Sequence, residues 1–204
     1  SPAGAEEQLR MIDTLTTNVT SFFREKHHFE HFSQFVVPEI IRRAQQGEKV
    51  RIWSSAYSSG QEPFSIAMTI LDCFPRANDY DIKVLATDIS SEMIDFCRCG
   101  VYTCAEVDSI PNNFLNKWSK RVGNEIHFLD DLRSLVSFKK LNLLMEWPIK
   151  CQFISIFCRN VAIYFERSTQ DMLWRRLADY LLPGGYLYIG HSEKIAHDTV
   201  PNIS

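Results

Sequence analysis

The segment Phe153–Cys158, FISIFC, is the feature that most restricts the fold of this chain. It is an apolar run, interrupted only by Ser155, with polar residues before and after it. Such a run is typical of a strand buried on both faces, and such strands occur in parallel sheets covered by helices. A chain of 204 residues, 45% of them hydrophobic, has the size for one such domain and a small subdomain.

Strand and helix patterns alternate along the rest of the chain. Apolar β-type runs predict strands at residues 50–54, 83–87, 153–158 and 186–189. Helical spacing and capping residues predict helices over 22–46 (with a break near Pro38), from Pro63 onward, from Ser90 or Ser91 to about 98, and over 168–182. The PGG at 183–185 is expected to end the last helix. This order predicts an α/β fold with a doubly wound, mostly parallel sheet.

One stretch departs from the alternation and predicts a small antiparallel β-subdomain. Apolar residues alternate over Glu125–Leu129 and again over Ser134–Phe138, which indicates a β-hairpin. Short helices, broken at Pro111, are expected in the preceding residues 105–118. We therefore place a β-subdomain insertion at about 122–138.

Charge and cysteine content exclude several classes of protein. The 22 Lys and Arg against 25 Asp and Glu give a net charge of −3, which argues against a nucleic-acid binder. No apolar run approaches the ~20 residues of a membrane-spanning helix, and the first ten residues do not resemble a signal peptide. The six cysteines have no regular spacing, so we expect reduced thiols and a cytoplasmic location.

Ligands of doubly wound sheets bind at the carboxyl ends of the strands, so residues 55–62, 88–90 and 158–165 are the candidates. Small side chains and Gly60 in the first loop would let a ligand approach the backbone, although the loop also suits an ordinary connection. Glu62 would favour a positive group and repel a phosphate; its plainer role is to complement the helix dipole. Asp88 is placed to accept hydrogen bonds from ribose hydroxyls, or else to cap the next helix.

Together these residues favour an adenosine-containing ligand without phosphates, and S-adenosylmethionine fits that description. Arg159 and Asn160 directly follow the buried strand, where polar groups would lie over the cleft. Tyr164 follows them and serves equally well as a packing residue. No metal is predicted: His27 and His31 lie four residues apart, as metal ligands do, but no third ligand accompanies them.

Several segments in this order resemble the CheR family, the S-adenosylmethionine-dependent methyltransferases of bacterial chemoreceptors. The resemblance covers roughly residues 17–193, and it rests on TNVTSFFRE (17–25), WSSAYSSGQEPFSIA (53–67), VLATDISSEMI (84–94), GVY (100–102), LNL (141–143), FCRNVAIYF (157–165) and PGGYLYIGHSE (183–193). It implies a class I methyltransferase domain over 21–204, preceded by a tail or remnant of an N-terminal helical region at 1–20.

The implied activity is methyl transfer to glutamate side chains on the cytoplasmic domains of chemoreceptors, which yields methyl esters and S-adenosylhomocysteine in chemotactic adaptation. Two alternatives stay open: a catalytically weak, cofactor-binding regulatory module, and a methyltransferase for another protein or RNA. The ends of the chain are short for the family, and the last antiparallel strands of the fold are not recognisable. The short turn near Val122–Glu125 implies that no receptor C-terminal peptide is used as a tether.

The resemblance also assigns site residues. The methionine end of the cofactor and the reacting centre would lie beside Asn18, Thr20 and Arg24. Glu62 would bind the cofactor amine, Asp88 the ribose, and Asn142 with Leu143 the adenine. The methyl-transfer pocket would be lined by Arg159, Asn160 and Tyr164. We expect Arg24 and Tyr164 to hold the substrate carboxylate, because a glutamate is already ionised at neutral pH and needs alignment more than a base. The loop reads GQEP where GEEP is expected.

Overall fold

A single parallel sheet forms the centre of the structure, a computed structural model that describes residues 20–196. Its five strands lie in the order β6-β2-β1-β7-β8 and every neighbouring pair is parallel. The strands are β1 (Val50–Ser55), β2 (Ile82–Asp88), β6 (Val136–Lys140), β7 (Phe153–Cys158) and β8 (Leu181–Ile189). The predicted α/β class and doubly wound parallel sheet are confirmed, and β7 is buried along its whole length.

The strand order reverses direction at the middle of this sheet. From β1 the chain adds β2 and β6 on one side, and it then crosses back to add β7 and β8 on the other side. The carboxyl ends of β1 and β7 therefore border the switch point. In open α/β sheets this crevice is where ligands bind.

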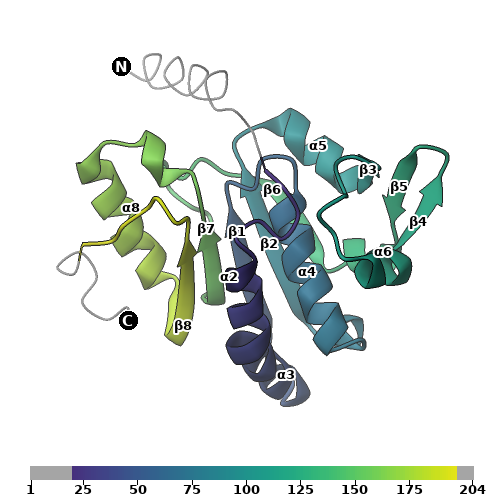
Figure 1. Cartoon of the computed structure of the whole chain (residues 1–204). Coiled ribbons are helices and arrows are strands. Elements are labelled where there is room, and N and C mark those ends of the chain that lie inside the picture. Colours follow the sequence, from purple (N-terminus) through teal and green to yellow (C-terminus); the bar gives the residue numbers. More distant parts are fainter. Residues whose placement is uncertain (1–19, 197–204) are drawn as a thin grey trace.

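Helices cover both faces of the sheet because the strand side chains alternate between two apolar clusters (Figure 1). Ile52 of β1 belongs to the cluster that packs α2 (Lys26–His31), α3 (Val37–Gln45) and α4 (Gln61–Cys73). Its neighbour Trp53 belongs to the other cluster, with α8 (Arg167–Asp179). The remaining helical elements are η1 (Phe32–Val36), η2 (Ala77–Asp79), α5 (Ser91–Cys99), α6 (Asn112–Trp118), α7 (Asp130–Arg133) and η3 (Ala162–Tyr164).

The first described helix begins later than predicted and is irregular in its middle. It starts at Lys26 rather than at residue 22, and the π-helical turn η1 separates α2 from α3. Pro38 lies in the first turn of α3, immediately after η1, as the predicted break near this residue implies. Proline lacks an N–H, so the preceding turn adopts the wider pattern. None of the helices in the described part of the chain is long and apolar enough to cross a bilayer.

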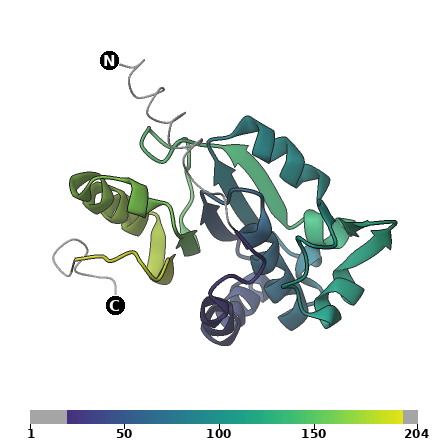
Figure 2. The same ribbon diagram turned by 45° about the horizontal axis from the view of Figure 1, so that its top comes forward.

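The small antiparallel sheet is present, but the predicted hairpin is wrong. The observed sheet has the order β3-β5-β4, from β3 (Val101–Thr103), β4 (Ser119–Val122) and β5 (Glu125–Phe128). It lies on the side of the molecule away from α8 (Figure 2). The subdomain thus spans about 101–128, not 122–138.

The second half of the predicted hairpin is β6, a strand of the main sheet. Val136 and Phe138 pair in parallel register with Val84 and Ala86 of β2. The alternation of apolar residues was read correctly as strand, but a period of two does not identify the partner strand. The short helix α7, on which Leu132 is buried, connects β5 of the small sheet to β6 of the main sheet.

The last helix and strand also have boundaries that differ from the prediction. Helix α8 ends at Asp179, and the PGG at 183–185 lies inside β8 rather than before it. The pairing of β7 with β8 shifts register between Phe153 and Ser155, which is the irregularity that accommodates this segment. Among the described strands β8 is an edge, and an edge strand tolerates a proline that cannot donate a ladder hydrogen bond.

Candidate functional site

A cavity of about 370 Å³ lies at the carboxyl ends of the parallel strands. Its walls include residues that directly follow each of the five strands, together with the N-terminal segment and Met93 of α5. The lining residues are Thr20, Ser21, Arg24, Phe29, Ala56, Tyr57, Ser58, Glu62, Asp88, Ile89, Met93, Leu141, Asn142, Leu143, Arg159, Asn160, Val161, Ile163, Tyr164, Phe165, His191 and Ser192.

The structure brings nearly all of the predicted site residues to this one cavity. Those that line it are Thr20, Arg24, Glu62, Asp88, Asn142, Leu143, Arg159, Asn160 and Tyr164. Asn18 lies outside the described residues. Gly60 is not among the lining residues. Its role is local: it precedes α4 with a φ of 88°, and a Cβ there would lie 2.7 Å from Cys97 Sγ and from Tyr102 Oη.

Asp88 ends β2 and fixes the two loops on either side of it. Its Oδ2 accepts a hydrogen bond from the Ser58 backbone N–H at 2.9 Å, and its Oδ1 accepts one from Ser90 N–H at 3.0 Å. The side chain is nearly buried yet borders the cavity. A carboxylate oxygen can accept more than one hydrogen bond, so a carboxylate at this position can also accept from hydroxyls of a ligand.

Glu62 and Arg159 form a buried ion pair at the switch point. Glu62 Oε2 accepts from Arg159 at 3.0 Å, and Glu62 Oε1 accepts from the Ser54 hydroxyl at 2.7 Å. Burial raises the pKa of Glu62, while the Arg159 charge and these hydrogen bonds oppose the rise. Glu62 therefore faces the cavity as part of a pair and not as an isolated anion, which the sequence did not indicate.

Arg159 also holds the N-terminal segment against the sheet. Its guanidinium donates to the backbone carbonyl of Arg24 and lies 3.2 Å from Glu25 Oε2. Glu25 Oε1 lies 3.1 Å from His191 Nδ1. Burial would raise the pKa of Glu25, but the hydrogen bonds from His191 and the charge of Arg159 outweigh it and lower that pKa to about 2. The buried guanidinium thus lies between two carboxylates.

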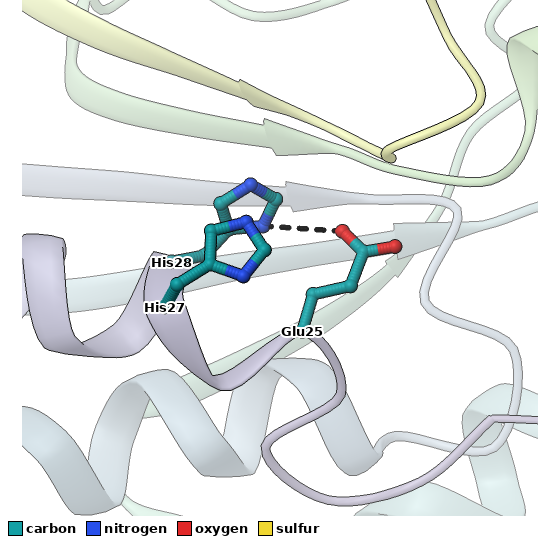
Figure 3. Close-up of side chains that lie close together, drawn as sticks. All are labelled: Glu25, His27 and His28. Atoms are coloured by element: carbon teal, nitrogen blue, oxygen red, sulfur yellow. Dashed lines mark ion pairs between the residues drawn. The ribbon is translucent and has the colours of Figure 1, made fainter.

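Glu25, His27 and His28 form a cluster whose candidate ligand atoms all lie within 4.8 Å of one another (Figure 3). We assign no metal to it, because Glu25 Oε2 lies 3.2 Å from the Arg159 guanidinium, which would repel a cation at that oxygen. Burial and the Arg159 charge lower the pKa of His28 to about 4, so its ring is neutral 3.4 Å from Glu25. His31, the other predicted candidate, instead bonds Tyr188 Oη at 2.9 Å.

Arg24 and Tyr164 come from different segments and border the same cavity. Arg24 precedes α2 and is half-buried. Tyr164 ends η3 and is 44% exposed. A guanidinium and a phenol at one opening can bind a carboxylate by charge and by hydrogen bonds.

Asn142 and Leu143 form the wall that follows β6. The Asn142 side chain accepts a hydrogen bond from Leu144 N–H at 2.9 Å, which fixes the turn. Leu143 is nearly buried and presents an apolar surface to the cavity. A flat apolar ring such as adenine fits a wall of this kind.

The residues that sequence reasoning missed include His191, which lines the cavity, and Glu25 and Glu193, which contact residues that line it. Glu25 was within the TNVTSFFRE segment, and the two others were within PGGYLYIGHSE, but no role was predicted for them. Each acts through contacts with segments far away in the sequence. No local spacing reveals such contacts, so the only available signal was the resemblance of these segments to a family.

The fold and the cavity define a class of protein. A parallel sheet with its cavity at the switch point, an acidic residue at the end of the second strand, and a loop without a phosphate-binding glycine pattern describe a class I S-adenosylmethionine-dependent methyltransferase. The residues present fit this cofactor: the Asp88 carboxylate at the cavity can accept from ribose hydroxyls, and the apolar wall at Leu143 suits an adenine ring.

Comparison with known proteins identifies the family. The model described as "CheR methyltransferase, SAM binding domain" matches residues 18–203. The chain belongs to the CheR methyltransferase family, and it is an S-adenosylmethionine-dependent methyltransferase of chemotaxis. The resemblance seen in the sequence is therefore confirmed.

Curated relatives match most of the chain. A probable chemotaxis protein methyltransferase of Rhizobium etli is 46% identical over 200 residues, which is 96% of this chain and 75% of the relative. Chemotaxis protein methyltransferase 2 of Pseudomonas aeruginosa is 37% identical, over 94% of this chain and 68% of its own length. The chemotaxis protein methyltransferase of Escherichia coli is 38% identical, over 91% and 64%.

Solved structures show more distant likenesses. PKMT2 from Rickettsia typhi in complex with AdoHcy is 17% identical with a TM-score of 0.42, over 69% of this chain and 20% of that one. The glycopeptide N-methyltransferase MtfA complexed with S-adenosyl-L-methionine is 14% identical with a TM-score of 0.41, over 74% and 52%.

Proposed function

We propose that this chain transfers a methyl group from S-adenosylmethionine to glutamate side chains of bacterial chemoreceptors, forming methyl esters in chemotactic adaptation. The observation that carries the proposal is that Arg24 and Tyr164 border the same cavity as Asp88. A carboxylate-binding pair thus lies beside the expected ribose acceptor. This arrangement suits an anionic acceptor better than a neutral amine or a base.

The chemistry needs alignment more than proton transfer. When bound, the cofactor supplies an activated methyl group. A glutamate side chain is ionised at neutral pH and is already a nucleophile. Arg24 would orient that carboxylate by charge-assisted hydrogen bonds, and Tyr164 would donate one from its hydroxyl. The apolar walls would exclude water from the reacting atoms.

The other cavity residues would hold the cofactor. Asp88 would accept from the ribose hydroxyls. Glu62, although paired with Arg159, would lie near the cofactor amine. Thr20 would border the methionine end, as would Asn18, which lies outside the described residues. Asn160 would line the methyl-transfer pocket. The adenine would lie against Asn142 and Leu143.

The proposed partners are the cytoplasmic domains of chemoreceptors, and the proposed location is the cytoplasm. The connection between β4 and β5 is short, since the paired residues Val122 and Glu125 are only three positions apart. We therefore propose that this protein does not use the β3-β5-β4 sheet to grip a receptor C-terminal peptide. A net charge of −3 disfavours RNA as the acceptor.

Transfer of tritiated methyl to a purified chemoreceptor cytoplasmic fragment tests the acceptor. We expect label that is released by mild base, because methyl esters hydrolyse in base and methylamines do not. A receptor fragment with its candidate glutamates changed to glutamine is the control and should take up no label. Base-stable label would indicate another acceptor, and no transfer by a chain that binds S-adenosylhomocysteine would favour the regulatory alternative.

A further inference from the structure

Glu193 is a buried carboxylate for which the proposed chemistry has no use. It is 7% exposed and follows β8, in a turn closed by a hydrogen bond from its own N–H to the Gly190 carbonyl at 2.9 Å. A buried anion of this kind is stable only when its oxygens are hydrogen-bonded. The groups that donate hydrogen bonds to Glu193 indicate its role.

Both oxygens of Glu193 accept backbone hydrogen bonds, four in all. Oε1 accepts from Val161 N–H at 3.0 Å and from Ala162 N–H at 2.8 Å. Oε2 accepts from Asn160 N–H at 2.9 Å and from Gly190 N–H at 2.7 Å. Three of these donors are consecutive residues of the loop that follows β7. Consecutive N–H groups around a residue with positive φ form a concavity for an anion, and Asn160 has a φ of 58°.

The loop held in this way forms one wall of the cavity. Asn160, Val161 and Tyr164 all line it, and η3 begins at Ala162. In the described part of the chain, no hydrogen bond or ring contact fixes the Tyr164 side chain, which is 44% exposed. The location of this side chain therefore depends on where its backbone lies. The Tyr164 N–H donates to the Val161 carbonyl at 3.2 Å.

The turn that carries Glu193 also packs tightly on this loop. A Cβ added at Gly190 would lie 2.6 Å from Asn160 Nδ2 and 3.0 Å from Asn160 N. A larger residue would displace the Asn160 amide and crowd the Asn160 backbone nitrogen, so glycine favours this approach. The short distance between the turn and the loop is what lets the Glu193 carboxylate reach the three N–H groups.

We propose that Glu193 is a positioning residue for methyl transfer. Its carboxylate fixes the backbone of residues 160–162 and, through it, the orientation of Tyr164 towards the acceptor carboxylate. This inference rests on the proposed function for the role of Tyr164. The contact between Glu193 and the loop stands on the structure alone.

Glu193→Gln is the first test, because the amide keeps the size of the side chain but points an NH2 group at N–H donors. We expect faster hydrogen exchange of the amides of residues 160–162, with exchange in β7 and α8 unchanged. We expect kcat for the receptor fragment to fall at least tenfold, while the Kd for S-adenosylhomocysteine changes less than threefold. Glu193→Asp, which retains the charge but shortens the reach, should give intermediate values.

Two further variants sharpen the test. Gly190→Ala leaves Glu193 intact and pushes the turn away from Asn160, so it should reproduce the loss of kcat and of exchange protection. Glu48→Gln, the same change at an exposed glutamate that follows α3 and does not line the cavity, should change neither quantity.

The outcomes separate the positioning role from a structural one. Unchanged exchange at 160–162, or an unchanged kcat, in Glu193→Gln would overturn the proposal. Loss of cofactor binding together with turnover, or failure of both Glu193 variants to fold, would assign the residue to stability and would overturn it as well. A wild-type chain that methylates no receptor fragment would count against the proposed acceptor instead, and the exchange measurement would still test the contact.

Discussion

At the scale of single residues, Arg159 is the charged group that links the two carboxylates of the site. It is buried between Glu62 and Glu25, and it donates to the backbone carbonyl of Arg24. Two carboxylates share this one guanidinium, so its charge is balanced within the site. Removing one partner of a buried ion pair commonly costs about 3–5 kcal/mol. We therefore expect substitution of Arg159 to lower the stability of the fold, whatever its effect on cofactor binding.

Arg24 can be tested by substitution, because the contact from Arg159 is to its backbone carbonyl. Arg24→Ala retains that carbonyl and removes the guanidinium that we expect to hold the acceptor carboxylate. Loss of a charge-assisted hydrogen bond of about 1.5–3 kcal/mol predicts a kcat/KM for the receptor fragment reduced about 10- to 150-fold. S-Adenosylhomocysteine binding, measured by calorimetry, should be retained. Arg76→Ala, at an exposed position, is the control, and equal turnover in both variants would contradict the assigned role.

His28 makes the stability of the fold depend on pH. Its pKa is about 4 in the folded chain against 6.5 as the ordinary value, because burial and the charges of Arg159 and His27 disfavour protonation, while Glu25 opposes them. The unfolded chain then takes up the proton first, so this stability is complete above pH 6.5 and is lost as the pH falls towards 4. After allowance for solvent screening we expect a loss of about 1 kcal/mol between pH 7 and pH 5.

Urea unfolding at pH 7 and pH 5 measures this dependence. His28→Gln should reduce the difference between the two pH values strongly. His27→Gln, which removes one of the smaller charges acting on His28 from the same helix, should reduce it only slightly. Glu25, with its pKa lowered to about 2, adds a further loss only below about pH 4.5. An equal pH dependence in wild type and His28→Gln would refute the assignment.

At the scale of elements, the start of α4 depends on a glycine that cannot be replaced without a clash. Gly60 and Gly47 both have positive φ, 88° and 79°. A Cβ at Gly60 would meet Cys97 Sγ and Tyr102 Oη at 2.7 Å, whereas one at Gly47 has no heavy atom within 4 Å. Gly47→Ala should therefore cost about 1 kcal/mol of backbone strain, and Gly60→Ala about 1–3 kcal/mol more from overpacking. Urea unfolding of the two variants gives the difference directly, and equal costs would show that α4 and α5 adjust freely.

The elements that the sequence predicted well are those with a strong local pattern. The apolar runs of β7, β1 and β2 are typical of strands buried in a parallel sheet. The boundaries of these strands were predicted to within one or two residues. The error at β6 concerned its partner. Val136–Lys140 is a strand, as predicted, but it pairs with β2, where Val136 lies opposite Val84, 52 positions earlier in the chain. Partner choice in a sheet depends on long-range packing, which alternation does not encode.

The site residues likewise divide into those that a local pattern predicts and those that depend on long-range contacts. Residues at or directly after the ends of strands, such as Asp88 and Arg159, could be placed at one cavity because the carboxyl ends of parallel strands meet at one edge of the sheet. Glu25 and Glu193 could not, because their partners lie more than 30 positions away along the chain. Gly60 was assigned to the cofactor because it stands in the right loop, but in the structure its surroundings are Cys97 and Tyr102.

At the scale of the whole molecule, the cavity joins the two halves of the sheet. Asp88 ends β2 and Leu143 follows β6 on one side of β1. Arg159 and Ser192 follow β7 and β8 on the other side. A ligand that contacts both sides binds the folded chain and not the unfolded one. It therefore stabilises the global fold by mass action, and not only the loops that touch it.

Thermal unfolding with S-adenosylhomocysteine tests this coupling. At a concentration 100 times the Kd, the stabilisation is about 2.7 kcal/mol, which for a chain of this size raises Tm by roughly 5–11 °C. Asp88→Asn removes a charged acceptor worth about 1.5–3 kcal/mol, so at the same concentration its own Tm should rise by less than about half as much. Asp108→Asn, an exposed position, should keep the full rise. Because each variant is compared with its own ligand-free Tm, a general loss of stability does not alter the comparison, and equal rises in all three proteins would place the ligand away from the end of β2.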